Sequence, residues 1–148
     1  MSARMVTAAR VAETLGGYRV MKRRVRTTER LHAHVQVGLP YSALMALAER
    51  LEVPVGRLGL ALNIAPRTLA RRRRARRLSP QESDRLARAA RIVAMAEDVL
   101  GARIKAARWI TEENWALGGA VPLDRLGTDI GARDVETVLG RFEHGVYS

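Results

Sequence analysis

The chain has 148 residues, 26 Lys+Arg against 15 Asp+Glu, a formal net charge of +11, no cysteine and few aromatic residues. This length is typical of one compact domain or two very small ones, and without cysteine there can be no disulfide scaffold, thiolate zinc site or cysteine nucleophile. The charge favours a polyanionic partner, which can be nucleic acid, an anionic membrane or an acidic protein.

The charge is distributed unevenly along the chain. Residues 1–78 carry 17 basic and 4 acidic side chains, a net charge of +13, whereas residues 79–148 carry 9 basic and 11 acidic side chains, a net charge of −2. A GC-rich genome is one explanation for the excess of arginine over lysine, but a codon bias does not segregate charge. The asymmetry indicates that the N-terminal half meets nucleic acid.

Neither a membrane span nor a signal peptide is expected. No stretch approaches 18 consecutive apolar residues, which is about the length that a helix needs to cross a bilayer. The first ten residues lack a charged segment followed by an apolar one. We therefore expect a cytoplasmic protein.

In chain order, helical spacing begins near the N-terminus. Residues 3–15 predict an Ala-rich helix, and residues 21–26 predict a basic arm. Thr27 or Thr28 is a suitable N-cap for a further helix, which ends at Gly38.

Residues 42–75 predict three consecutive helices. The second and third, Pro54–Leu62 and Pro66–Ala75, are joined by the three-residue turn 63–65. This size and punctuation are typical of a DNA-binding helix-turn-helix, whose second helix enters the major groove.

The second helix of this motif carries the candidate DNA contacts. They are Arg67, Thr68, Arg71, Arg72 and Arg74. Arginine matches both guanine edges and phosphates, and a run of arginines that points in every direction mostly contacts phosphates. A solvated helix face, and a nuclear-localisation or RNA-binding tract, remain alternative interpretations.

Ser79 and Glu82 form a capping-box signature, with a proline between them, at the start of a helix that runs to about Leu100. Gly101 ends this helix. The spacing of Arg85, Arg88 and Arg91 predicts a solvated stripe along it.

The last third predicts shorter helices over residues 103–110, after Pro122 and over residues 131–143. No alternating pattern longer than four residues is present. The predicted fold class is therefore all-α.

Other polar constellations give weak signals. His32 and His34 point about 200° apart on a helix and cannot share a metal ion. The pairs 97–98 and 112–113 are acidic and are expected to be caps or solvated surface. We therefore expect no metal, no cofactor and no catalytic residues. The two tryptophans are expected to anchor the core or an interface.

The chain ends with apolar side chains at Phe142, Val146 and Tyr147, where polar residues are usual. Two interpretations are open: this end folds back on its own domain, or it inserts into a pocket of a partner.

A series of motifs across residues 28–148 resembles the Xre/MbcA/ParS-like antitoxins of bacterial toxin–antitoxin operons, whose usual partner is a RES-domain toxin. The matching segments are Gly38-Leu39-Pro40 and residues 64–72, 78–86, 105–109, 122–128 and 135–147. Their order and spacing make the resemblance specific.

The resemblance implies an N-terminal arm or helix (1–27), a helix-turn-helix module (28–80) and a toxin-binding module (81–148). Such antitoxins form homodimers, bind and repress their own operator, and block the active site of a toxin that consumes NAD⁺.

In the family, the C-terminal end lies at the active-site cleft of the toxin and excludes NAD⁺. Carried over to this chain, that role falls on the last four residues, and we add two aromatic side chains of the same module as candidates. The predicted toxin-binding residues are therefore Trp109, Phe142, Gly145, Val146, Tyr147 and Ser148.

This sequence has more arginines than the family usually has between Leu69 and Ser79, so which of them read bases stays open. Rival functions are a stand-alone dimeric transcriptional regulator and an antitoxin of another toxin class, such as an acetyltransferase-like one. An enzyme is disfavoured, because no nucleophile, metal set or phosphate loop is evident.

Overall fold

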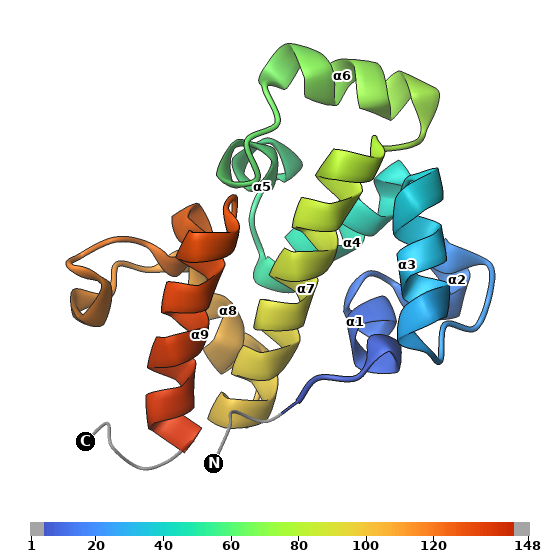
Figure 1. The fold of residues 1–148 in the computed structure, drawn as a ribbon. Helices are drawn as coiled ribbons and strands as arrows, with labels where there is room; N and C mark the ends of the chain where they lie inside the picture. The colour runs from blue at the N-terminus through green and yellow to red at the C-terminus, as the bar shows by residue number, and fades with distance from the viewer. Residues whose placement is uncertain (1–4, 144–148) are drawn as a thin grey trace.

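The computed structural model describes residues 5–143, and this part of the chain consists of helices joined by short turns (Figure 1). The elements are α1 (Ala8–Thr14), α2 (Gly17–Met21), α3 (Thr28–Val37), α4 (Tyr41–Leu51), α5 (Val55–Ala61), α6 (Pro66–Ala75), α7 (Pro80–Leu100), α8 (Arg103–Thr111), the 3₁₀ turns η1 (Trp115–Leu117) and η2 (Pro122–Arg125), and α9 (Asp129–Glu143). The all-α prediction is confirmed. Over the described range, none of these helices combines the length and apolarity needed to cross a membrane.

Local signals determine most of the helix boundaries. Thr27 caps α3 by accepting a hydrogen bond from the backbone of the first turn, and Gly38 ends that helix with a positive φ of 106°. The predicted capping box of α7 is also present: the Ser79 hydroxyl accepts from the Glu82 backbone N–H, and the Glu82 carboxylate accepts from the Ser79 backbone N–H. Gly101 ends α7 in the left-handed conformation, which costs glycine little.

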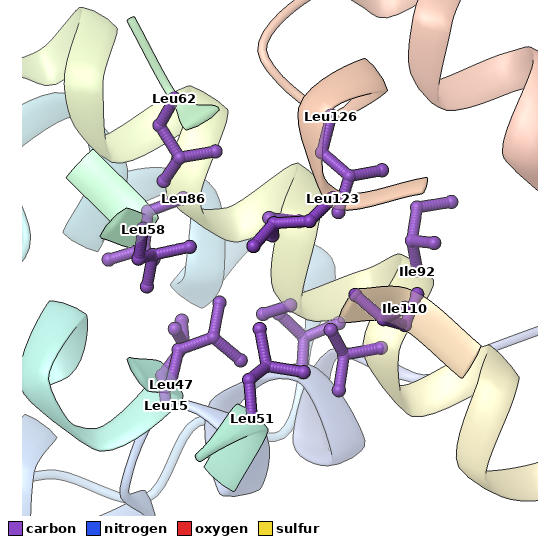
Figure 2. Close-up of a cluster of buried hydrophobic side chains, with 14 of the residues drawn as sticks. Leu15, Leu47, Leu51, Leu58, Leu62, Leu86, Ile92, Ile110, Leu123 and Leu126 are labelled. Atoms are coloured by element: carbon purple, nitrogen blue, oxygen red, sulfur yellow. The ribbon is translucent and has the colours of Figure 1, made fainter. Parts of the chain in front are cut away.

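The helix α7 runs through the middle of the molecule, and α1, α3, α8 and α9 all pack against it (Figure 1). Leu86, Ile92 and Met95 of α7 are fully buried. Figure 2 shows leucine and isoleucine side chains from elements far apart in the chain meeting beside this helix. They include Leu15, Leu47, Leu51, Leu58, Leu62, Leu86, Ile92, Ile110, Leu123 and Leu126. One continuous apolar core therefore joins the N-terminal and C-terminal halves.

The segment before α3 belongs to this core. Val11 and Leu15 of α1 are buried, as are Met21 and Val25. The prediction of a basic arm over residues 21–26 is wrong, because these last two buried side chains hold the segment against the fold. The short helix α2 was not predicted, since five residues that begin with glycine give no clear helical period.

A carboxylate near the C-terminal end of α7 is buried and paired with arginines from two earlier helices. Glu97 accepts hydrogen bonds from Arg50 Nε at 2.6 Å and Nη2 at 2.8 Å, and from Arg10 Nη2 at 3.4 Å. Arg10 Nη2 also donates to Asp98 at 3.1 Å. Burial raises the pKa of Glu97, but the hydrogen bonds and positive charges of Arg50 and Arg10 outweigh it, so the pKa is lowered. The expectation of a cap or solvated surface is wrong for Glu97.

The arginines of α7 also differ from the prediction. Arg85, Arg88 and Arg91 are half-buried rather than fully solvated. One reason is that α9, which starts at Asp129 and so two residues earlier than expected, packs beside α7. Arg91 Nη2 donates to Glu136 of α9 at 3.1 Å, a contact that helical spacing within α7 cannot reveal.

Replacing Glu97 by glutamine tests the role of the buried carboxylate. Its lowered pKa stabilises the folded state above the unfolded-state value of about 4.3, and this stabilisation disappears as the pH falls through the folded-state pKa. We expect E97Q to lower the free energy of unfolding at pH 7 by about 3 kcal/mol and to reduce its decline between about pH 5 and pH 3. Urea denaturation followed by circular dichroism at several pH values measures both effects. The exposed Glu113→Gln is the control, and an unchanged pH dependence in E97Q would contradict the assignment.

Candidate nucleic-acid interface and partner-binding module

The turn between α5 and α6 has the predicted position and a defined geometry. Asn63 adopts a left-handed conformation with φ of 61°, and the Ile64 N–H donates to the Gly59 carbonyl at 2.8 Å. Pro66 occupies the first turn of α6, where its missing N–H costs no hydrogen bond. A Cβ at Gly59 would lie 3.2 Å from Leu69 Cδ2, so glycine lets α6 pack closely on α5. The predicted helix–turn–helix arrangement of these two helices is confirmed.

The helix α6 lies at one end of the molecule, with much of its surface directed outward (Figure 1). It contains no buried residue, and Leu69 is half-buried against the core. Its C-terminal end is fixed by backbone pairing, because the Tyr41 N–H donates to the Arg76 carbonyl at 3.1 Å and the Leu78 N–H donates to the Leu39 carbonyl at 2.9 Å. The helix is therefore supported from below at both ends and open above.

Three of the predicted DNA contacts share the outward face of α6. Arg67, Arg71 and Arg74 recur at the helical spacing i, i+4 and i+7, and all three side chains are exposed. Within residues 5–143 no carboxylate forms an ion pair with them. Thr68, beside this face, is half-buried. The face therefore offers unneutralised guanidinium groups to an anionic ligand.

Arg72 faces the other way. Its Nε donates to Glu82 Oε1 at 2.7 Å and its Nη2 donates to Oε2 at 3.2 Å. Burial raises the pKa of Glu82, but the hydrogen bonds from Arg72 and Ser79 outweigh it and lower the pKa, so the carboxylate is charged. Of the five predicted contacts, Arg72 is thus the one whose guanidinium is occupied inside the protein, where it ties α6 to α7.

The basic surface extends beyond the predicted residues. Arg73 and Arg76 are exposed as well, and Arg77 donates to the Gly38 carbonyl at 2.7 Å. These side chains were left out of the predicted contacts because the sequence does not reveal that α6 lies at the edge of the fold. A second basic group, made of Arg23, Arg24, Arg26 and Arg30, lines a shallow surface depression between α2 and α3.

The structure gives no support for a metal centre in the part of the chain that it describes. Among residues 5–143, three or more His, Asp or Glu side chains do not gather at one point. The chemistry that α6 offers is the donation of hydrogen bonds and positive charge to an anion.

In the C-terminal module, the structure brings Trp109 and Phe142 together. Trp109 of α8 is half-buried, and its ring meets the Phe142 ring edge-on, with centroids 6.0 Å apart and an interplanar angle of 83°. This contact attaches the end of α9 to α8. The other predicted toxin-binding residues, 145–148, lie outside the described residues. Trp115 is 81% exposed, so the interpretation of this residue as a core anchor is wrong.

Comparison with known families matches two successive parts of the chain. Residues 30–91 match the antitoxin Xre-like helix-turn-helix domain. Residues 95–145 match the antitoxin Xre/MbcA/ParS C-terminal toxin-binding domain. The first match contains α5 and α6, and the second contains Trp109 and Phe142.

Curated relatives carry the name antitoxin Xre. The protein of Yersinia enterocolitica is 33% identical over 116 residues, which cover 77% of this chain and 78% of the relative. The protein of Pseudomonas putida is 37% identical over 117 residues, which cover 78% and 72%. The protein of Photorhabdus laumondii is 38% identical over 73 residues, or 49% of each chain.

The outward arginine face of α6 is tested by Arg67→Ala and Arg71→Ala. We expect each variant to weaken binding to duplex DNA and to reduce the slope of log K against log salt concentration by about 0.9 for each phosphate that the variant no longer neutralises. Fluorescence anisotropy between about 50 and 200 mM salt, where such contacts strongly affect the affinity, measures this. Arg133→Ala is the matched control, since it removes the same charge from a side chain that is 75% exposed on α9. If both α6 variants keep the wild-type slope, these side chains do not contact phosphates.

Proposed function

The chain belongs to the Xre/MbcA/ParS family of antitoxins, and on this premise we propose that it neutralises a RES-domain, NAD⁺-consuming toxin and represses its own operon. The observation that carries the proposal is the succession of a helix-turn-helix domain and a toxin-binding domain in one chain. The family consists of antitoxins, not enzymes, so both activities are binding activities.

Repression of the operon is supported by the geometry of α6. Its outward face presents Arg67, Arg71 and Arg74 without carboxylate partners among residues 5–143, which suits an approach to the major groove and its flanking phosphates. A helix-turn-helix that reads a two-fold operator acts as a dimer, with one half-site for each copy. We therefore propose that the active repressor is a homodimer bound to the operator of its own operon.

Neutralisation of the toxin is proposed to be steric. Residues Gly145, Val146, Tyr147 and Ser148 would enter the NAD⁺ cleft of the toxin, and no bond is formed or broken. The contact between Trp109 and Phe142 supports this role, because it fixes the end of α9 shortly before these four residues.

The positions of the two surfaces are compatible with both activities. The helix α6 lies at one end of the molecule, and the last turn of α9 lies at the opposite end (Figure 1). A toxin held at the end of α9 therefore leaves the outward face of α6 accessible to DNA.

Two alternatives make different predictions. A stand-alone dimeric regulator would not bind the product of the adjacent reading frame, and an antitoxin of another class would bind a product without a RES domain. Co-purification of the chain with the protein encoded beside it, followed by an assay of NAD⁺ consumption, distinguishes all three.

Deletion of residues 145–148 tests the steric mechanism. We expect the truncated chain to leave the NAD⁺ hydrolysis of the RES-domain protein uninhibited, because the side chains that exclude NAD⁺ are gone, and to bind operator DNA with unchanged affinity. Fluorimetric measurement of NAD⁺ and DNA anisotropy give the two readouts.

Arg67→Ala is the reciprocal control for this deletion, since it should lose operator affinity and keep full inhibition of the toxin. Inhibition by the truncated chain at wild-type concentrations would rule out the tail mechanism.

A further inference from the structure

Two large apolar side chains of the C-terminal module are exposed far more than packing of the chain requires. Trp115 of η1 is 81% exposed and Ile130 of α9 is 76% exposed. Both lie within residues 95–145, the range that matches a toxin-binding domain. Tryptophan buries about 150 to 250 Å² when it is covered and is among the residue types most enriched at binding hot spots, so its exposure here calls for a partner.

Trp115 is presented by a loop with a defined conformation. The Asn114 side chain accepts from the Ala116 N–H at 2.9 Å, and the Asn114 backbone N–H donates to the Ala120 carbonyl at 3.0 Å, which closes the loop at its base. Leu117, two residues after Trp115, is buried in the core. A ring held on such a loop loses little conformational entropy when a partner covers it.

Arg125 joins this loop to the helical turn that carries Ile130. Its Nη2 donates to the Leu117 carbonyl at 3.2 Å, and its Nη1 donates to Asp134 Oδ2 at 3.2 Å. Asp134 follows Ile130 by four residues and therefore shares its face of α9. In Figure 1 the loop projects from the side of the molecule on which α9 lies. The charges between the two apolar groups are thus already paired within the chain.

We propose that Trp115 and Ile130 are the anchors of a docking surface for the toxin, distinct from the residues 145–148 that exclude NAD⁺. The inference rests on the proposed function, and it assigns affinity to this surface and inhibition to the tail. The complementary surface of the toxin is apolar, with a pocket for an indole ring. A toxin is favoured over a second copy of this chain because both anchors lie in the range matched by the toxin-binding domain and outside the range matched by the helix-turn-helix.

The proposal is tested on the full chain with the RES-domain protein of the adjacent reading frame as the probe. We expect Trp115→Ala to weaken the affinity about 30-fold or more and Ile130→Ala to weaken it about 10-fold, the range of hot-spot truncations. Isothermal titration calorimetry measures the dissociation constant, and circular dichroism checks that each variant is folded.

Two exposed residues outside the proposed surface provide matched controls. Tyr18→Ala removes an aromatic ring that is 66% exposed on α2, and Leu60→Ala removes an aliphatic side chain that is 58% exposed on α5. Both variants should keep the wild-type affinity within about twofold, which is below the usual size of a hot-spot effect.

A second measurement avoids substitution of Trp115. The chain contains two tryptophans, so labelling with 5-fluorotryptophan gives two ¹⁹F signals, which Trp109→Phe assigns. Addition of the unlabelled RES-domain protein should shift and broaden the Trp115 signal. A complex in which the Trp115 signal is unchanged would overturn the inference.

The outcomes separate the two proposals. If the wild-type chain does not bind the RES-domain protein, the proposed function fails and the inference fails with it. If the wild type binds and Trp115→Ala binds equally well, the inference alone is overturned. If Trp115→Ala binds the toxin normally but no longer forms the homodimer, the surface is an interface between copies of this chain, and the inference is again overturned.

Discussion

Two carboxylates buried near opposite ends of α7 have to be neutralised by arginines from other elements, and this requirement determines much of the arrangement. Glu97 is neutralised by Arg50 of α4 and Arg10 of α1, and Glu82 by Arg72 of α6. Removing one partner of such a pair leaves a buried charge uncompensated, which costs about 3 to 5 kcal/mol. The helices that supply the arginines are therefore held in one register along α7, while the apolar core provides the bulk of the stability.

The helix α7 also connects the two functional regions. The family matches end at residue 91 and resume at residue 95, both inside this one helix, which spans about 31 Å at 1.5 Å per residue. A second joint lies at the turn before α6, where Asn63 Nδ2 donates to the Gly127 carbonyl at 3.3 Å. A Cβ at residue 127 would lie 2.6 Å from the Ala61 carbonyl oxygen, so this close approach requires glycine. The DNA-binding helix and the toxin-binding module are consequently packed as one body.

The sequence predicted what neighbouring residues determine. The caps at Thr27 and Ser79, the end at Gly38 and the all-α class follow from local hydrogen bonding and periodicity. It did not predict contacts between residues far apart in the chain. Glu97 looked like a surface residue because its partner Arg50 lies 47 positions away. Arg72 looked equivalent to its neighbours because only the position of α7 distinguishes its face of α6. The exposure of Trp115 was equally invisible, since an apolar residue after a turn is usually buried.

The net charge of +11 therefore includes arginines with different roles. Those of the first 78 residues that pair with carboxylates inside the fold are Arg10, Arg50, Arg57 and Arg72. The exposed face of α6 carries arginines that the fold leaves available to DNA, and binding through them weakens steeply with salt because counterions are released. The proposed contacts of Trp115 and Ile130 are apolar and respond little to screening. Rising ionic strength would then release the operator before the toxin, which follows from the separation of charged and apolar surfaces along one chain.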